Sequence, residues 1–160
     1  MIVLCTITFS GCFGLSRELG NLVGAVGDAV EKVNEQAQEA DGIVQGFCAN
    51  VSNGDLDSAT KKMHPDVVQS KEQLAALVSR WESENFIRVS EGIELYALVD
   101  FYVVLKDVEY GGTTYQIGYS ATIGKITVNL LFLVVKNENG FGIYTLTIER
   151  FLESGSEGWV

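Results

Sequence analysis

The sequence predicts an α+β fold, in which helices come first along the chain and an antiparallel sheet follows. Between Leu15 and Val51 the apolar residues recur at steps of three and four, which is the period of an amphipathic helix. After Asn85 they recur at every second position, as in strands. Glycine-containing turns separate the strand-like segments, so we expect a meander of neighbouring strands.

The first helical segment, residues 15–51, contains several glycines, which weaken a helix. We expect the segment to divide at Gly42 into a tether or stalk helix and the first helix of the domain. The apolar seam of the stalk is rich in valine and alanine. This seam packs either on its own domain or on the stalk of a second copy.

A second, short helix is expected after the turn at residues 53–54, which ends the first helix. Asp55 is a good N-cap for the second helix, and the His-Pro pair at residues 64–65 marks its end. A third helix opens with Ser-x-x-Gln at residues 70–73, the pattern of a capping box. Its apolar stripe consists of Leu74, Leu77, Val78 and Trp81.

Four strands follow the third helix in this prediction. A Gly-Gly pair at residues 111–112 joins the first two strands, and Asn-Glu-Asn-Gly at residues 137–140 joins the last two. The third strand, ITVNLLFLVVK, is apolar along its centre, so both of its faces are expected to be buried. The expected strands cover residues 98–110, 113–121, 126–136 and 141–151.

The charge of the chain limits its partners. The formal net charge is −10 and the sequence pI is about 4.5. Such an acidic protein is repelled by phosphate backbones, so we expect no nucleic acid partner. It is also repelled by anionic lipid headgroups, so a membrane anchor for this chain would have to be hydrophobic or covalent.

The N-terminal segment provides a candidate for such an anchor. Residues 1–9 form an apolar run that is too short to span a bilayer, which needs about 20 residues, but fits the apolar part of a secretory signal. The following stretch, Phe9-Ser10-Gly11-Cys12, resembles the signal of bacterial lipoproteins. Phe9 stands where that family usually has leucine, and no Lys or Arg precedes the apolar run. The alternative is that IVLCTITF forms a buried N-terminal strand, since it is rich in β-branched residues.

The lipoprotein resemblance implies a specific processing route. Residues 1–11 would be removed, and Cys12 would become the first residue, diacylated on its sulfur. The protein would then be attached to the membrane of the cell envelope through these acyl chains, facing outside the cytoplasm. Cys48 would be the one remaining free thiol, and the spacing of the cysteines fits no zinc site.

Between its expected helices the domain has an Asn-Gly-Asp turn at residues 53–55, an alanine at position 59 and a His-Pro pair at residues 64–65. Three helices followed by a bent antiparallel sheet resemble the nuclear transport factor two-like fold, also called the cystatin-like superfamily. The resemblance implies a cone-shaped domain over residues 38–152, preceded by the tether over residues 12–37 and followed by a flexible tail over residues 153–160. The matching positions are Asn53, Gly54, Asp55, Ala59, His64 and Pro65.

In this superfamily the cone has a pocket at its open end, and some members are isomerases or dehydratases. Their catalytic motifs do not match this chain. The weak candidates for acid–base catalysis are His64, the one histidine, and Asp100, which interrupts an apolar strand. His64 is alternatively a helix-terminal histidine favoured by the helix dipole, and Asp100 a charge that protects an edge strand.

Four aromatic side chains are candidates for lining a pocket, and the alternative for each is ordinary packing in the core or sheet. They are Tyr102, Tyr115, Tyr119 and Trp81. The sequence contains no pattern for a metal or a cofactor, and we expect neither.

Together these features favour a membrane-anchored extracytoplasmic lipoprotein that is not an enzyme, whose domain binds a protein partner or a small apolar ligand. One alternative is a small isomerase or dehydratase with His64 and Asp100 in the cone. Another is an assembly module that forms a homodimer through the open sheet face or the helix seam.

Overall fold

The computed structural model describes residues 23–150, with side chains from residue 31 onward. The expected signal segment, the tether before residue 23 and the C-terminal tail lie outside the described residues. Within them, the secondary structure elements are α1 (Val23–Ser52), α2 (Leu56–Thr60), α3 (Lys71–Asn85), a short 3₁₀ turn η1 (Val89–Glu91), β1 (Ile93–Asp107), β2 (Gly112–Ile123), β3 (Ile126–Lys136) and β4 (Phe141–Arg150).

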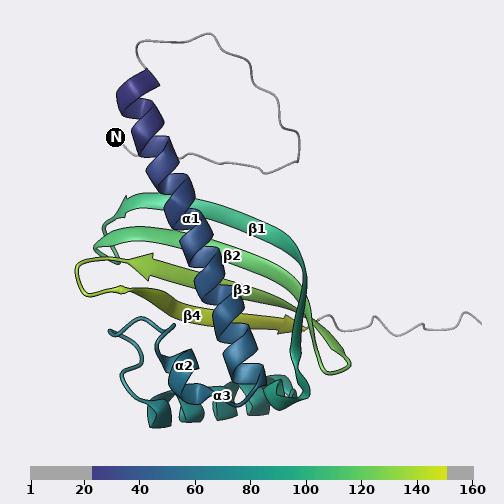
Figure 1. The fold of residues 1–160 in the computed structure, drawn as a ribbon. Coiled ribbons are helices and arrows are strands. Elements are labelled where there is room, and N and C mark those ends of the chain that lie inside the picture. Colours follow the sequence, from purple (N-terminus) through teal and green to yellow (C-terminus); the bar gives the residue numbers. More distant parts are fainter. Residues whose placement is uncertain (1–22, 151–160) are drawn as a thin grey trace, which may run out of the picture.

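The predicted α+β fold is confirmed. The four strands of the described region form one antiparallel sheet in the order β1-β2-β3-β4, which is not closed. Figure 1 shows α1 crossing one face of this sheet, with its N-terminal turns projecting beyond β1. Helices α2 and α3 lie beside the C-terminal end of α1, on the side of β4. The core therefore lies between the sheet and the three helices.

The expected division of the first helix at Gly42 is wrong, because α1 runs without a break from Val23 to Ser52. Gly42 is exposed, and an added Cβ there would meet nothing within 4 Å. A glycine in a helix costs about 1 kcal/mol relative to alanine. The apolar burial along the opposite side of the helix outweighs this cost. That buried side consists of Ala40, Val44, Phe47, Cys48 and Val51.

The predicted N-caps of α2 and α3 are confirmed. The Asp55 side chain accepts a hydrogen bond from the Ser58 N–H at 3.0 Å and begins α2. The Ser70 hydroxyl oxygen accepts one from the Gln73 N–H at 3.3 Å and begins α3. The Gln73 side chain accepts from the N–H of Gln69, at 2.7 Å, which is one residue earlier than in a standard capping box.

The third predicted strand matches β3 in its bounds but not in its burial. The side chains that face the helices are buried, whereas Leu131 and Leu133, on the other face, are half-buried. No element of the described chain covers this outer face, so the expectation that both faces are buried is wrong. The inward-facing residues of β3 are Val128, Leu130, Phe132 and Val134.

Strand β1 begins at Ile93, five residues before the expected start at Leu98, and is irregular. Its pairing with β2 shifts at three places, between Leu95 and Ala97, Leu98 and Asp100, and Val104 and Asp107. Such bulges bend a strand and increase its twist. Each bulge also changes which side chains face the helices, and this decides where Asp100 points.

Candidate functional site

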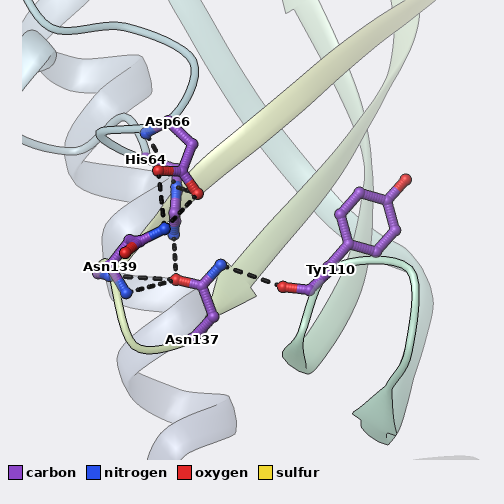
Figure 2. Close-up of polar contacts among 6 residues, drawn as sticks. His64, Asp66, Tyr110, Asn137 and Asn139 are labelled. Carbon is purple, nitrogen blue, oxygen red and sulfur yellow. Dashed lines mark hydrogen bonds and ion pairs between the residues drawn. The ribbon is translucent and has the colours of Figure 1, made fainter.

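His64, the first candidate catalytic residue, lies in the loop between α2 and α3 and is 0% exposed. Its backbone N–H donates to Ile143 O at 2.8 Å, and the Ile143 N–H donates to Lys62 O at 2.9 Å. These two bonds fix the loop along the start of β4, and Figure 2 shows the His64 side chain facing the hairpin between β3 and β4. α2 already ends at Thr60. The stabilisation of a histidine by the helix dipole declines beyond the last turn of the helix, so the expectation of a helix-terminal histidine is wrong.

Asn137 is the central polar residue of this hairpin (Figure 2). Its side-chain nitrogen donates to the Tyr110 carbonyl at 3.1 Å. Its side-chain oxygen accepts from the backbone N–H groups of Asn139 at 2.9 Å and Gly140 at 3.2 Å. These partners assign the amide orientation, so the oxygen of Asn137 is the atom that faces His64.

Both ring nitrogens of His64 are therefore used in the neutral form of the ring. Nε2 lies 3.0 Å from the Asn137 oxygen, an acceptor, so Nε2 carries the proton. Nδ1 accepts from the backbone N–H of Asp66 at 3.2 Å. The carboxylate of Asp66 is 3.5 Å from the same nitrogen and also accepts from the Asn139 side chain. No ring nitrogen remains for a substrate.

Close packing around the histidine also excludes a substrate. A Cβ added at Gly142 would lie 2.7 Å from the backbone nitrogen of His64, and one at Gly140 would lie 2.9 Å from the Pro65 ring. The Tyr144 ring lies 5.7 Å from the imidazole, centroid to centroid. His64 thus joins the α2–α3 loop to the β3–β4 hairpin, which is a structural role.

Asp100, the second candidate, lies on β1 and is exposed. Asp100 pairs with Gly118, and Leu98 pairs with the next residue of β2, Tyr119. Val99 is therefore an extra residue, a bulge, between Leu98 and Asp100. Tyr119 faces the helices, so Gly118 and Asp100 face the outer side of the sheet. There the Asp100 carboxylate accepts a hydrogen bond from the Gln116 side chain at 2.6 Å. Of the two alternatives for Asp100, the acid inside the cone is therefore wrong, and the charge on an edge strand is confirmed.

The two catalytic candidates cannot act together. Asp100 lies on β1, at one edge of the sheet, and His64 lies against β4, at the other edge. Three strand spacings separate these edges, which is about 14 Å. Catalysis by this pair, as in the isomerase or dehydratase alternative, has no support in this geometry.

Two of the candidate pocket tyrosines connect the sheet to α1. The Tyr115 hydroxyl donates to the Gln36 side chain at 3.0 Å, and the Tyr119 hydroxyl donates to Asp41. Gln45 donates to the same Asp41 carboxylate at 2.8 Å. Burial raises the pKa of both tyrosines to about 12, and for Tyr119 the bond to Asp41 adds to the effect. Gln36 and Asp41 could not be recognised from the sequence as partners of these tyrosines, because polar residues on a helix usually face water.

The other two candidates do not join these tyrosines in a pocket. Tyr102 is 39% exposed and lies on the outer face of β1. Trp81 is buried, and its ring lies 6.2 Å from that of Phe47, edge to face. The four aromatic side chains therefore occupy three different environments and do not line one site.

The interior between α1, α3 and the sheet is filled by side chains. A cavity of about 10 Å³ remains, which is room for about one water molecule. Cys48 lines this cavity, and burial raises the pKa of its thiol to about 12. This cysteine is therefore an unreactive core residue. The cavity is lined by Phe47, Cys48, Val51, Trp81, Val89, Ile93, Ile123, Leu130, Phe132, Leu146 and Ile148.

Among the residues that the structure describes, no group of three His, Cys, Asp or Glu side chains is arranged to hold a metal ion. Within residues 23–150, no helix combines the length and the apolar character needed to cross a bilayer. Comparison of the chain with protein-family models, with curated proteins and with solved structures gave no match.

Proposed function

We propose that the chain is a membrane-anchored lipoprotein of the cell envelope, whose domain lies outside the cytoplasm and binds a protein partner through its surface. Binding through the surface is proposed because the interior of the domain is filled by side chains. The cavity that remains there has a volume of about 10 Å³. A site for a small organic molecule usually has a volume of about 300–1,000 Å³. Binding therefore takes place on the outside of the domain, and a small apolar ligand in the cone is disfavoured.

The proposed attachment rests on the sequence around Cys12. Phe9-Ser10-Gly11-Cys12 has the small residues that precede the modified cysteine in lipoproteins. Ten residues separate Cys12 from Val23, the first residue of α1, and they span at most about 35 Å when extended. Two acyl chains give stable attachment, since each buried methylene contributes about 0.8 kcal/mol. This offsets the repulsion of an acidic domain from anionic headgroups.

Replacing Cys12 with alanine is expected to abolish lipid attachment. Cells that express the full chain would be fed a labelled fatty acid, and the label on the protein would be measured in membrane and soluble fractions. The wild type would carry label and sediment with membranes, whereas Cys12→Ala would carry none. Cys48→Ala is the matched control and would keep its label, because Cys48 is buried in the core. Label retained by Cys12→Ala would contradict the attachment.

One observation favours a second candidate function, that of a homodimeric assembly module. β1 is a 15-residue edge strand with several exposed apolar side chains, and such an edge can pair with another strand. Three bulges and the charge of Asp100 oppose this pairing. The exposed apolar residues of β1 are Tyr96, Leu98, Val99, Tyr102 and Leu105.

Replacing Asp100 with valine is expected to convert a monomer into associating species, because it removes the charge from the centre of the apolar edge. Light scattering over a concentration series would show this as a rising mass. Glu109→Gln, which removes a charge from the exposed β1–β2 turn, is the control and would stay monomeric. A stable dimer of the wild type would instead favour the assembly module.

A further inference from the structure

An open hollow lies at one end of the sheet, where the β1–β2 hairpin and the end of β3 approach α1. Figure 1 shows the β1–β2 hairpin and the end of β3 together at this end. The hollow has a volume of about 510 Å³ and is open to solvent. None of its lining residues belongs to the His64 network or lines the filled interior.

The hollow is lined by three lysines from three elements, although the chain as a whole is strongly acidic. Lys32 comes from α1, Lys106 from β1 and Lys136 from β3. In residues 31–150, no carboxylate lies within 4.0 Å of any of the three ammonium groups; the ion pairs found there involve other residues. Among the residues whose side chains are described, three lysines without an ion-pair partner therefore line one space.

The remaining polar groups of the hollow add donors and one carboxylate, so the lining holds three lysines and one aspartate. The Gln36 oxygen accepts the hydroxyl of Tyr115, which leaves the amide nitrogen of Gln36 to donate. Thr113 contributes a hydroxyl group. The one carboxylate in the lining, that of Asp107, accepts from the Glu109 N–H and from the Thr114 hydroxyl, both at 3.0 Å. The hollow thus presents donors to a ligand rich in acceptors.

Lys136 is held in place by its surroundings, and Lys106 has an unusual backbone conformation. The Lys136 ammonium group lies 4.7 Å from the centre of the Phe141 ring, a cation–π contact. The Phe141 ring in turn lies 5.7 Å from that of buried Tyr115. Lys106 has φ +54°, a left-handed conformation that residues other than glycine rarely adopt. Such conformations cluster at functional sites.

We propose that this hollow binds the phosphate group of a phosphate ester. A phosphate monoester carries close to two negative charges and offers three terminal oxygens, which suits ammonium groups arriving from three elements. A planar carboxylate is better matched by the fork of an arginine, and no arginine lines the hollow. The hollow is larger than a phosphate group, which leaves room for the alcohol part of the ester.

The phosphate could belong to a lipid headgroup or to a soluble metabolite, since both carry the same phosphate ester group. It does not depend on the acylation of Cys12. Two probes distinguish the sources: glycerol 3-phosphate in solution, and vesicles of phosphatidylcholine with or without phosphatidic acid. Binding would be measured by titration calorimetry and cosedimentation, and by amide chemical shifts of Gly111, Gly112 and Thr113.

Lys106→Gln and Lys136→Gln are each expected to weaken binding by at least about tenfold, the usual effect of losing a hydrogen bond to a charged group. Lys125→Gln is the matched control. Lys125 is exposed in the turn between β2 and β3, at the other end of the sheet, so its loss should change the affinity less than about twofold. The variants should keep the amide spectrum of the folded chain, since all three side chains reach solvent.

Each outcome has a defined meaning. Binding of phosphatidic acid vesicles without glycerol 3-phosphate binding would support the proposal with a lipid headgroup as the source. Binding of glycerol 3-phosphate with local amide shifts would support it with a soluble ester. Absence of binding in both experiments would overturn it. Equal losses of affinity in Lys125→Gln and Lys106→Gln would also overturn the proposal, because they would show that binding responds to net charge alone.

Discussion

Replacing Phe47 with alanine is expected to lower the free energy of unfolding by about 3–5 kcal/mol, the usual cost for a buried phenylalanine. Phe47 is 1% exposed and comes from α1. Its ring contacts Trp81 of α3 at 6.2 Å and Phe132 of β3 at 6.4 Å, both edge to face. It therefore joins both main helices to the sheet. Small domains are stable by only about 5–15 kcal/mol, so this is a large share of the total.

Urea unfolding followed by tryptophan fluorescence would measure the effect, because Trp81 lies beside the substituted ring. Phe86→Ala is the matched control, since Phe86 is 80% exposed and should change stability by less than about 0.5 kcal/mol. A loss below about 1 kcal/mol in Phe47→Ala would contradict the packing of α1 and α3 on the sheet.

Replacing His64 with alanine is expected to cost about 2–4 kcal/mol of stability, from a cavity and from two lost hydrogen bonds. The backbone N–H of Asp66 would lose its acceptor, and the oxygen of Asn137 would lose one of its donors. The loop between α2 and α3 would become less firmly attached to β4. Thermal and urea unfolding would measure the loss, and hydrogen exchange at Ile143 would locate it.

Asn139→Ala is the control for this network. Asn139 is exposed and contacts Asp66 but not the imidazole, so its replacement should cost less than about 1 kcal/mol. If His64→Ala were as stable as the wild type, the structural role of the histidine would be wrong. A role in catalysis would then have to be considered again.

The parts of the fold that depend on local chemistry could be predicted from the sequence. Asp55 and Ser70 cap their helices as expected, because a cap depends on residues within one turn. The bounds of β3 match the predicted strand, because its apolar run ends in turn residues on both sides. The order of helices and strands is enough to give the fold class.

Other features depend on tertiary packing and could not be predicted. The glycine at position 42 favours a break by its intrinsic propensity, but the apolar residues on the other side of α1 are held against the sheet. The direction of Asp100 could not be predicted, because strict alternation would place it on the same face as Leu98. A bulge at Val99 puts these two side chains on opposite faces, and a single sequence carries no clear signal for it.

The candidate site was predicted less well than the fold, because its contacts join distant parts of the chain. His64 and Asn137 are 73 residues apart, and the hairpin at residues 137–140 was interpreted only as a turn. The lysines of the open hollow are similarly separated, at positions 32, 106 and 136. Only the folded arrangement brings them to one end of the sheet.

The intact mass of the protein from its native membrane fraction tests the central proposal most directly. The proposal that Cys12 is the acylated first residue predicts a mass equal to residues 12–160 plus the acyl chains. An unmodified full-length mass in the soluble fraction would contradict it. IVLCTITF would then belong to the mature chain, and the function of the domain would have to be sought away from a lipid anchor.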